Sequence, residues 1–433
     1  MNNDTIFALS SGHGKSGVAV IRISGDNLGG LFSDLSGRKN FDARHAYFAN
    51  MRGADGEIID QCILIFFAAP ASFTGTDVIE IHCHGADAVV QKIFSDLDAR
   101  GGRMAMPGEF SKRAFYSGKM DLADVDGLAA LLDAQTDRQR KSALQSMMGR
   151  DSEIYDAWRA QMIEISAYAA AMLDYADDEL PANIGEKIRA HTQKLYDEIN
   201  DALSRYATSR AIRSGFNITL AGRTNVGKSS IFNYMVGANR AIVSDIPGTT
   251  RDVVSASMDI DGYLVNLSDT AGLRETQDVI EKIGIDKTHA EIENADLVIR
   301  VIDQGSEFRV QSSNKEIIVI NKSDLINGER ANGVIYTSAK TGDGMDALMR
   351  AITTRMHEIM GNTEGALAIN ERTRQCLTDA AGELKNAIEL SGDNYDIFAE
   401  HTRRAADAIG KILGSITAAE VMDATFSQLC LGK

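Results

Sequence analysis

The chain has 433 residues, of which 44% are apolar, 24% are charged and only 4 are prolines. This length exceeds the size at which one hydrophobic core keeps growing, so we expect about two to four domains, and the composition excludes a collagen-like or low-complexity protein. The formal net charge of −16 excludes a protein that coats nucleic acid non-specifically, because phosphate binding needs many lysines and arginines.

The sequence predicts neither a membrane span nor a secretory leader. Its longest strongly apolar run, residues 63–71, is too short to cross a bilayer, and no basic segment followed by an apolar one opens the chain. Near the C-terminus Cys430 lies where a prenylation signal would place it, but Gly432 and Lys433 do not suit that signal. We therefore expect a cytoplasmic protein without a lipid anchor. Its cysteines fit free thiols better than a disulfide framework: Cys62, Cys83, Cys376 and Cys430.

Residues 1–118 are predicted to form an α+β region. Short β-rich runs cover residues 17–23, 62–67 and 77–82, and a helix is expected over residues 87–99. The run His82-Cys83-His84 raises the question of a zinc site. Alternation along a strand places the two histidines on one face and the cysteine on the other, which disfavours a shared metal.

Helices are predicted over residues 119–213 and again over residues 361–433. The first stretch is rich in Ala, Leu, Met, Glu and Arg at helical spacing, and in the second Thr417 and Glu420 form a capping box that opens the last helix. Between them, residues 214–360 alternate helical segments with apolar strands, a rhythm that predicts βαβ units around a mainly parallel sheet. We expect this α/β domain to be inserted into a helical one; two independent helical domains are the alternative. The predicted strands are residues 217–221, 264–268, 297–302, 317–320 and 333–336.

A phosphate-binding loop is predicted where residues 222–229 read GRTNVGKS, directly after an apolar strand and before a helix. Glycines let backbone N–H groups close around phosphates, Lys228 supplies a point charge and the Ser229 hydroxyl binds Mg²⁺. By contrast, Gly14-Lys15-Ser16 is discounted because Leu9 stands where the loop needs a glycine.

Three further signatures follow in the order that a GTPase needs. A loop with Thr249 and Thr250 offers a threonine that completes the Mg²⁺ shell and senses the γ-phosphate, and residues 269–272 read DTAG at the end of a strand. Residues 321–324 read NKSD, in which Asp324 can accept from guanine N1–H and N2–H₂, while residues 338–340 read SAK and would present a backbone amide to guanine O6.

The sequence therefore predicts a Mg²⁺-dependent domain that binds and hydrolyses GTP. Mg²⁺ is assigned to Ser229 and Thr250. The nucleotide-binding residues are expected to be Asn225, Val226, Gly227, Lys228, Ser229, Ser230, Ser244, Asp245, Ile246, Pro247, Gly248, Thr249, Thr250, Asp269, Thr270, Ala271, Gly272, Asn321, Lys322, Asp324, Ser338, Ala339 and Lys340.

Hydrolysis needs a group other than the glutamine that orients water in familiar small GTPases, because Leu273 occupies that position. Asp278 and Glu281 are the nearby carboxylates on an expected helix, and spacing alone favours solvated helix residues at both positions.

The whole chain resembles the MnmE (TrmE) family of tRNA-modification GTPases, one of the TrmE-Era-like GTPases. Its most specific features are residues 73–80 (FTGTDVIE), residues 107–115 (PGEFSKRAF), the switch loop with Pro247 and the terminal residues 430–433 (CLGK). The resemblance implies an N-terminal folate-binding and dimerisation domain, a helical domain and an inserted G domain.

The resemblance also implies that K⁺ replaces an arginine finger when two G domains meet. Its expected ligands are Asn225, Ser244, Ile246 and Thr249, and Glu281 is expected to position the attacking water. Asn225, Thr249 and Glu281 thus become catalytic candidates.

A reduced one-carbon tetrahydrofolate, formyl or methylene, is the second implied ligand. Its expected ligands are Arg22, Glu80, Lys119 and Lys433, since a carboxylate can hold a pterin N–H edge while Arg and Lys suit the glutamate tail. Cys430 is similar to the family's C-terminal cysteine; a catalytic thiol and a buried structural cysteine both stay open.

The implied function is modification of C5 of the wobble uridine (position 34) of certain tRNAs to carboxymethylaminomethyl or aminomethyl uridine. The implied partners are a second copy of the chain, tRNA, and the flavin-dependent protein MnmG (GidA) in a heterotetramer, with no membrane. The alternatives are a ribosome-assembly switch GTPase and a folate-dependent methyl-group transferase with a regulatory G domain.

Overall fold

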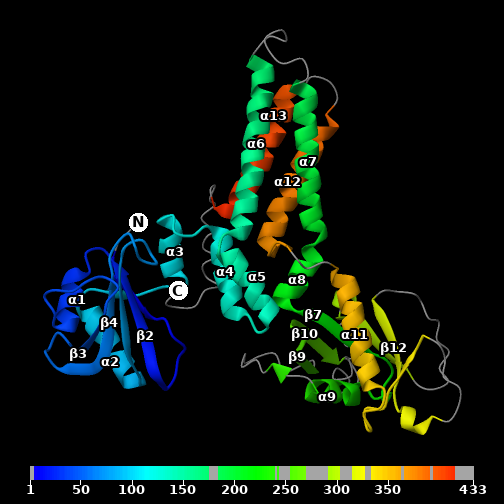
Figure 1. Cartoon of the computed structure of the whole chain (residues 1–433), viewed down its shortest axis with the longest axis horizontal. Helices are drawn as coiled ribbons and strands as arrows, with labels where there is room; N and C mark the ends of the chain where they lie inside the picture. The colour runs from blue at the N-terminus through cyan, green and yellow to red at the C-terminus, as the bar shows by residue number, and fades with distance from the viewer. Residues whose placement is uncertain are drawn as a thin grey trace, which may run out of the picture. The chain divides into compact units, whose positions relative to one another are not determined.

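The computed structural model describes residues 4–174, 184–238, 241–242, 254–269, 291–302, 315–326, 333–361, 365–390 and 394–414 (Figure 1). The chain divides into two compact units. The first comprises Met1–Ala129, Met147–Ala160 and Ala406–Lys433, and the second comprises Ala130–Ser146 and Gln161–Ala405.

The first unit is built on a six-stranded sheet in the order β3-β4-β5-β2-β1-β6. All neighbouring strands run antiparallel except β1 and β6, which are parallel. Antiparallel strands can be joined by short connections, which explains how short segments alternate here without long crossovers. The strands are β1 (Ile6–Leu9), β2 (Ser16–Gly25), β3 (Ala46–Arg52), β4 (Ile58–Phe67), β5 (Asp77–Gly85) and β6 (Arg103–Met104).

The two faces of this sheet differ because side chains alternate along each strand. One face is packed into a core with α1 (Gly29–Ser36) and α2 (Asp87–Ala99), which contain the fully buried Phe32 and Ile93. The other face carries apolar side chains that are exposed: Val18 by 58%, Phe48 by 63% and Ile63 by 41%. Two further helices follow, α3 (Glu109–Tyr116) and α4 (Leu122–Asp133).

The second unit contains a seven-stranded sheet in the order β13-β12-β11-β7-β10-β9-β8. Five strands are parallel, and β9 and β8 add an antiparallel edge. The strands are β7 (Phe216–Ala221), β8 (Ala241–Ile242), β9 (Val254–Ile260), β10 (Tyr263–Asp269), β11 (Leu297–Ile302), β12 (Glu316–Ile320) and β13 (Ile335–Tyr336). Near-continuous apolar strands, such as β7 and β11, are typical of a parallel sheet covered on both faces. The helices α8 (Tyr206–Ser214), α9 (Lys228–Ala238) and α11 (Met345–Met360) contribute to its core.

Helices that precede this sheet in the sequence pack against helices that follow it (Figure 1). They are α6 (Arg150–Asp174), α7 (Ile184–Ser204), α12 (Glu371–Glu389) and α13 (Tyr395–Leu413); α5 (Asp137–Met147) precedes them in the chain. Within the second unit α7 packs against α12, and Ser166 of α6 donates to Thr402 of α13 at 3.1 Å. The Arg189 side chain of α7 also donates to the Leu390 carbonyl at 3.0 Å. The α/β segment therefore interrupts one helical assembly.

The fold class predicted from the sequence is confirmed: an α+β N-terminal region, helices, and an inserted α/β domain with a mainly parallel sheet. The expected strands correspond to β2, β4, β5, β7, β10, β11, β12 and β13, and the expected helix to α2. The sequence patterns missed the short strands β1, β6 and β8 and the longer antiparallel strands β3 and β9. The boundaries at residues 118, 213 and 360 stay predictions, and the capping box of Thr417 and Glu420 lies outside the described residues.

Helix α4 begins with two aspartates that cap each other. The Asp121 N–H donates to Asp124 Oδ2 at 3.0 Å, and the Asp124 N–H donates to Asp121 Oδ1 at 2.8 Å. This reciprocal arrangement satisfies two amides at the helix start. Burial raises the pKa of Asp124 to about 6, against the opposing effect of the Asp121 N–H.

Replacing Asp124→Asn should stabilise the protein above pH 6 and have little effect near pH 4. The folded-state pKa is raised, so the native protein holds a proton that the unfolded chain releases between about pH 4 and 6, and stability falls as the pH rises through that window. We expect a gain on the order of 1–2 kcal/mol at pH 8, less than the full shift implies because the carboxyl is only partly buried. Thermal unfolding at pH 5.5, 6.5 and 8 measures this, and a pH-independent difference would contradict it.

Candidate functional site

The phosphate-loop sequence lies between β7 and α9, and its backbone is tightly enclosed. Gly222 and Gly227 have φ values of +148° and +98°, which L side chains rarely adopt. A Cβ at Gly222 would lie 2.1 Å from the Val301 carbonyl oxygen, and one at Gly227 would lie 2.1 Å from Asn321 Nδ2. Both positions therefore require glycine, for conformation and for space.

Lys228 and Ser229 are the first two residues of α9, at the end of this loop. Lys228 is 4% exposed, and its Nζ donates to the carbonyl oxygens of Gly222 at 2.9 Å and Arg223 at 2.8 Å. The ammonium group is thus fixed inside the loop that sequence analysis assigned to phosphates. Ser229 Oγ donates to Asp269 Oδ2 at 2.7 Å, and Asp269 is 2% exposed. A hydroxyl and a buried carboxylate meet where a hard cation such as Mg²⁺ finds oxygen ligands.

Asn321 joins the phosphate loop to the segment assigned to the base. Its side-chain amide donates to the carbonyl oxygens of Val226 and Gly227, both at 3.3 Å, and its Oδ1 accepts the Ala339 N–H at 3.2 Å. Asn321 is 7% exposed, so these bonds are shielded from water. One side chain therefore sets the spacing of three loops.

Asn225 of the phosphate loop is held by Lys322, which follows Asn321 in the NKSD motif. It is a non-glycine residue with φ of +65°, and its carbonyl oxygen accepts a hydrogen bond from Lys322 Nζ at 2.7 Å. Asparagine tolerates this conformation better than most residues, so the position suits its chemistry. The contact fixes the part of the loop that was assigned to a cation.

Asp324 is held in its ionised form at the base end. The Ser338 hydroxyl donates to Asp324 Oδ1 at 2.7 Å, and this hydrogen bond, with a smaller attraction from Lys340, holds the pKa of Asp324 below its ordinary value. An ionised carboxylate can only accept hydrogen bonds. It therefore suits the two N–H groups on one edge of guanine and disfavours adenine, which offers no such pair.

The structure thus brings together Asn225 to Ser230, Asp269, Asn321, Lys322, Asp324 and Ser338 to Lys340. Sequence reasoning missed the role of the Asn321 side chain in bonding the loop, although its place in the motif was the signal for it. The other calls lie outside the described residues: Ser244, Asp245, Ile246, Pro247, Gly248, Thr249, Thr250, Thr270, Ala271, Gly272, Glu281, Cys430 and Lys433.

Two residues predicted to bind folate, Arg22 and Glu80, face each other on paired positions of β2 and β5. Arg22 donates to Glu80 Oε1 through Nε at 3.2 Å and Nη2 at 2.9 Å. Its guanidinium carbon lies 5.1 Å from the ring centre of Phe73 and 5.9 Å from that of Phe110. Sequence reasoning missed these aromatic contacts, although both rings belong to the motifs that carried the resemblance.

His82 lies beside Glu80 on the same face of β5, with its Nε2 at 3.5 Å from Glu80 Oε2. Farther along the strand, His84 Nδ1 lies 2.8 Å from Asp60 Oδ1. Cys83 points the opposite way into the core, where burial raises its pKa to about 11. The two histidines thus pair with different carboxylates.

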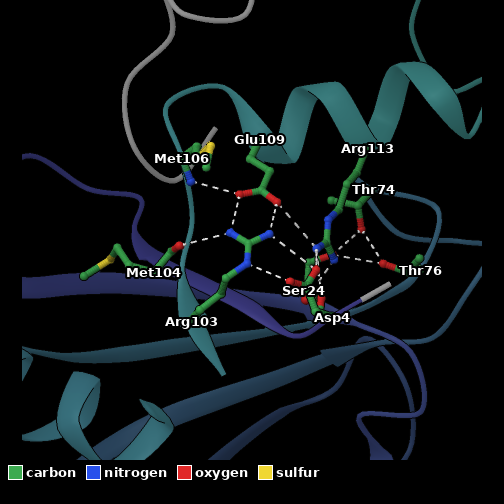
Figure 2. Close-up of polar contacts among 9 residues, drawn as sticks. All are labelled: Asp4, Ser24, Thr74, Thr76, Arg103, Met104, Met106, Glu109 and Arg113. Atoms are coloured by element: carbon green, nitrogen blue, oxygen red, sulfur yellow. Dashed lines mark hydrogen bonds and ion pairs between the residues drawn. The ribbon is translucent and has the colours of Figure 1, made fainter. Parts of the chain in front are cut away.

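A polar network fixes the loop that carries Phe73 (Figure 2). The Ser24, Thr74 and Thr76 hydroxyls lie within 2.8–3.0 Å of one another. In the same loop, a Cβ at Gly75 would lie 3.9 Å from Lys119 Cε, so the third predicted folate ligand borders this loop.

Arg103 and Arg113 extend the network to the start of the chain and to α3 (Figure 2). Arg103 donates to Asp4 at 2.6 Å and to Glu109 at 2.6 and 2.9 Å, while Arg113 donates to Asp4 at 2.9 Å and to the Ser24 carbonyl at 3.2 Å. Burial would raise the pKa of Glu109, but the Arg103 hydrogen bonds, the Met106 N–H and the charges of Arg103 and Arg113 together hold that pKa below its ordinary value.

A mainly parallel sheet with a glycine loop between a strand and a helix, together with the NKSD and SAK segments, defines a P-loop protein of the guanine-nucleotide-binding class. Family models described as "MnmE helical domain" and "GTP-binding protein TrmE N-terminus" match residues 122–430 and 5–119. The chain therefore belongs to the MnmE (TrmE) family of tRNA modification GTPases, as its sequence motifs indicated.

Curated relatives match it along nearly their whole length. The chain is 39% identical to the tRNA modification GTPase MnmE of Parvibaculum lavamentivorans, over 99% of this chain and 100% of that protein. It is 38% identical to the same-named protein of Agrobacterium fabrum, over 99% of each. Among solved structures, the G domain of the T. maritima FeoB iron transporter is 27% identical over 33% of this chain and 98% of that chain, with a TM-score of only 0.26.

Replacing Asp324→Asn should weaken GTP binding roughly ten- to a hundredfold, because one charged hydrogen-bond partner is lost. Xanthosine triphosphate should regain affinity, since the new amide can donate to its 2-carbonyl. Equilibrium titration with labelled nucleotides measures both, and Asp343→Asn, an exposed change in the neighbouring loop, serves as the control. Unchanged GTP affinity in the Asp324 variant would remove this residue from the base site.

Proposed function

We propose that this chain is a potassium-activated GTPase that modifies tRNA together with the flavin-dependent partner MnmG (GidA). The reaction places a carboxymethylaminomethyl or aminomethyl group on C5 of the wobble uridine (position 34) of certain tRNAs, using a one-carbon unit from reduced folate. The observation that carries the proposal is the full-length likeness to proteins named tRNA modification GTPase MnmE, in a chain that contains the nucleotide site.

The proposed parts are an N-terminal folate-binding and dimerisation domain (1–118), a helical domain in two parts (119–213 and 361–433) and an inserted G domain (214–360). No helix in the described ranges is long and apolar enough to span a membrane. We place the protein in the cytoplasm as a homodimer that forms a heterotetramer with MnmG.

GTP hydrolysis would use Lys228, Ser229 and Asp269 at the phosphate loop, together with residues outside the described ranges. Lys228 supplies positive charge to the phosphates, and Ser229 with Thr250 holds Mg²⁺, next to the buried carboxylate of Asp269. K⁺ would be held by Asn225 together with Ser244, Ile246 and Thr249, with Glu281 positioning the water. The support in the structure is the fixed, left-handed backbone of Asn225.

The N-terminal unit supports a folate site with a modified division of roles. Glu80 can accept the pterin N–H groups, and Lys119 borders the same loop, but Arg22 already donates twice to Glu80. Arg22 therefore orients the carboxylate as well as offering charge to the folate tail. Lys433 and the thiol of Cys430 belong to the same proposed site.

A dimer is supported by the exposed apolar face of the N-terminal sheet. Phe48 of β3 and Ile63 of β4 are directly paired and exposed by 63% and 41%, and Val18 of β2 is exposed by 58%. Burying apolar surface of this kind against a second copy would stabilise the pair, since apolar area gains about 25 cal/mol per Å² on leaving water.

A deletion strain should accumulate tRNA whose wobble uridine lacks the C5 substituent, and the wild-type chain should restore it. Mass spectrometry of tRNA nucleosides is the measurement. Complementation with Lys228→Ala should fail because the phosphate charge is lost, and Glu80→Gln should fail because a pterin acceptor is lost. Normal tRNA with misassembled ribosomes would instead favour the ribosome-assembly function. If Lys228→Ala failed but Glu80→Gln restored the modification, the proposed folate step would be contradicted.

GTP turnover should be faster in KCl than in NaCl at equal ionic strength, on the order of tenfold or more, because a bound cation stabilises the transition-state charge. The matched variant is Asn225→Gly, which tolerates the positive φ and removes only the side chain. We expect this variant to be equally slow in both salts. Equal wild-type rates in both salts, with dimers confirmed by light scattering, would exclude the Asn225 role.

A further inference from the structure

The turn between β9 and β10 is contacted by side chains of two helices, α5 and α11. Ile260 and Tyr263 are paired, so Asp261 and Gly262 form a two-residue turn with φ values of +54° and +79°. Two positive φ values suit a tight β-hairpin, and the Gly262 N–H donates to Asp259 Oδ1 at 2.7 Å. The turn thus closes with its own residues.

Two helices nevertheless hold this turn from outside the sheet. The Arg138 guanidinium of α5 lies 4.0 Å from the ring centre of Tyr263, and Arg138 Nε donates to the Asp261 carbonyl at 3.4 Å. His357 of α11 lies with Nε2 at 2.9 Å from Asp261 Oδ2, and its ring meets the Tyr263 ring edge-on at 5.8 Å. We call Arg138, Asp261, Tyr263 and His357 the turn clamp.

Helix α5 is itself anchored next to the phosphate-loop strand. Gln139 is 7% exposed and accepts the backbone N–H groups of Gln135 and Thr136, which caps the start of α5. Its amide group donates to the Arg213 carbonyl at 2.9 Å, at the end of α8 and just before β7. The base of α5 is therefore fixed independently of the hairpin.

The far end of the hairpin is the catalytic end. Val254 opens β9 directly after the predicted switch loop, and it is paired with Asp269, which closes β10 and accepts the Ser229 hydroxyl. Seven consecutive residue pairs join the two strands without a bulge. A continuous ladder of this kind links the turn to both strand ends, of which the Asp269 end is also held by the pairing of β10 with β7.

We propose that Arg138 and His357 are positioning residues for GTP hydrolysis, acting through the β9–β10 hairpin on Asp269 and the switch segment. The proposal rests on the GTPase activity proposed above. The clamp residues come from three separate elements, and Asp261 and His357 are exposed by 53% and 43%, so core packing does not explain their contacts. By thermodynamic linkage, the free energy by which the turn clamp favours the nucleotide-bound position of the hairpin equals the free energy by which bound nucleotide favours the clamp contacts.

The test is the turnover of GTP by full-length Arg138→Ala. Loss of the free energy of the cation–π contact with Tyr263 should lower kcat roughly three- to tenfold. The KM for GTP should change by less than about twofold. Arg138→Lys keeps a cation over Tyr263 and should recover most of the rate. Arg140→Ala is the matched control, because Arg140 pairs with Asp137 of its own helix, and it should match the wild type.

Hydrogen exchange supplies a second readout that does not need catalysis. With a non-hydrolysable GTP analogue bound, the amides of β9 and β10 should exchange faster in Arg138→Ala than in the wild type or Arg140→Ala. Wild-type kcat in Arg138→Ala, an equal loss of GTP affinity and kcat, or unchanged exchange would overturn the positioning role. A wild-type chain that binds but does not hydrolyse GTP would overturn the GTPase proposal, and the exchange comparison would still decide whether the clamp restrains the hairpin.

Discussion

The buried amide of Asn321 is the interaction on which the nucleotide site depends. A triphosphate and its base are bound by segments that are far apart in the sequence, and their separation must match one ligand. Asn321 bonds the phosphate loop through two carbonyls and the SAK segment through one N–H, so both ends of the site share one side chain. In a dry environment such bonds are strong and costly to break, which makes the spacing rigid before any ligand arrives.

The N-terminal unit solves a comparable problem with ion pairs. Asp4 and Arg103 are 99 positions apart, yet they meet, and Arg113 ties the same aspartate to the Ser24 backbone. Because Arg103 also binds Glu109, the first strand, the sixth strand and α3 are held together around the loop that borders Arg22. Arginine suits this work because its planar fork donates to two carboxylates at once.

Local motifs were predictable from the sequence because their chemistry requires neighbours in the chain. The glycine loop, NKSD and SAK each follow a strand, and strand ends are legible as apolar runs bounded by turn residues. The pairing of residues that are far apart in the chain cannot be predicted in this way. Nothing near Arg22 indicates that Glu80 lies opposite it, and nothing near Arg138 indicates Tyr263. The antiparallel β9 was missed although VSASMDI alternates apolar and polar residues, and its Met258 and Ile260 are buried in the core of the sheet.

An acidic chain can still hold a highly charged nucleotide because the site is screened from the rest of the molecule. At physiological ionic strength exposed charges are screened beyond about 8 Å, whereas Lys228 is buried and acts on its surroundings through a low dielectric. The start of α9 adds the positive end of a helix dipole at the same point. The net charge of −16 therefore matters little within the loop. The net charge does matter for extended polyanions, because their many phosphates also approach acidic surface outside the nucleotide site. Such a ligand therefore requires a local basic patch or a basic partner.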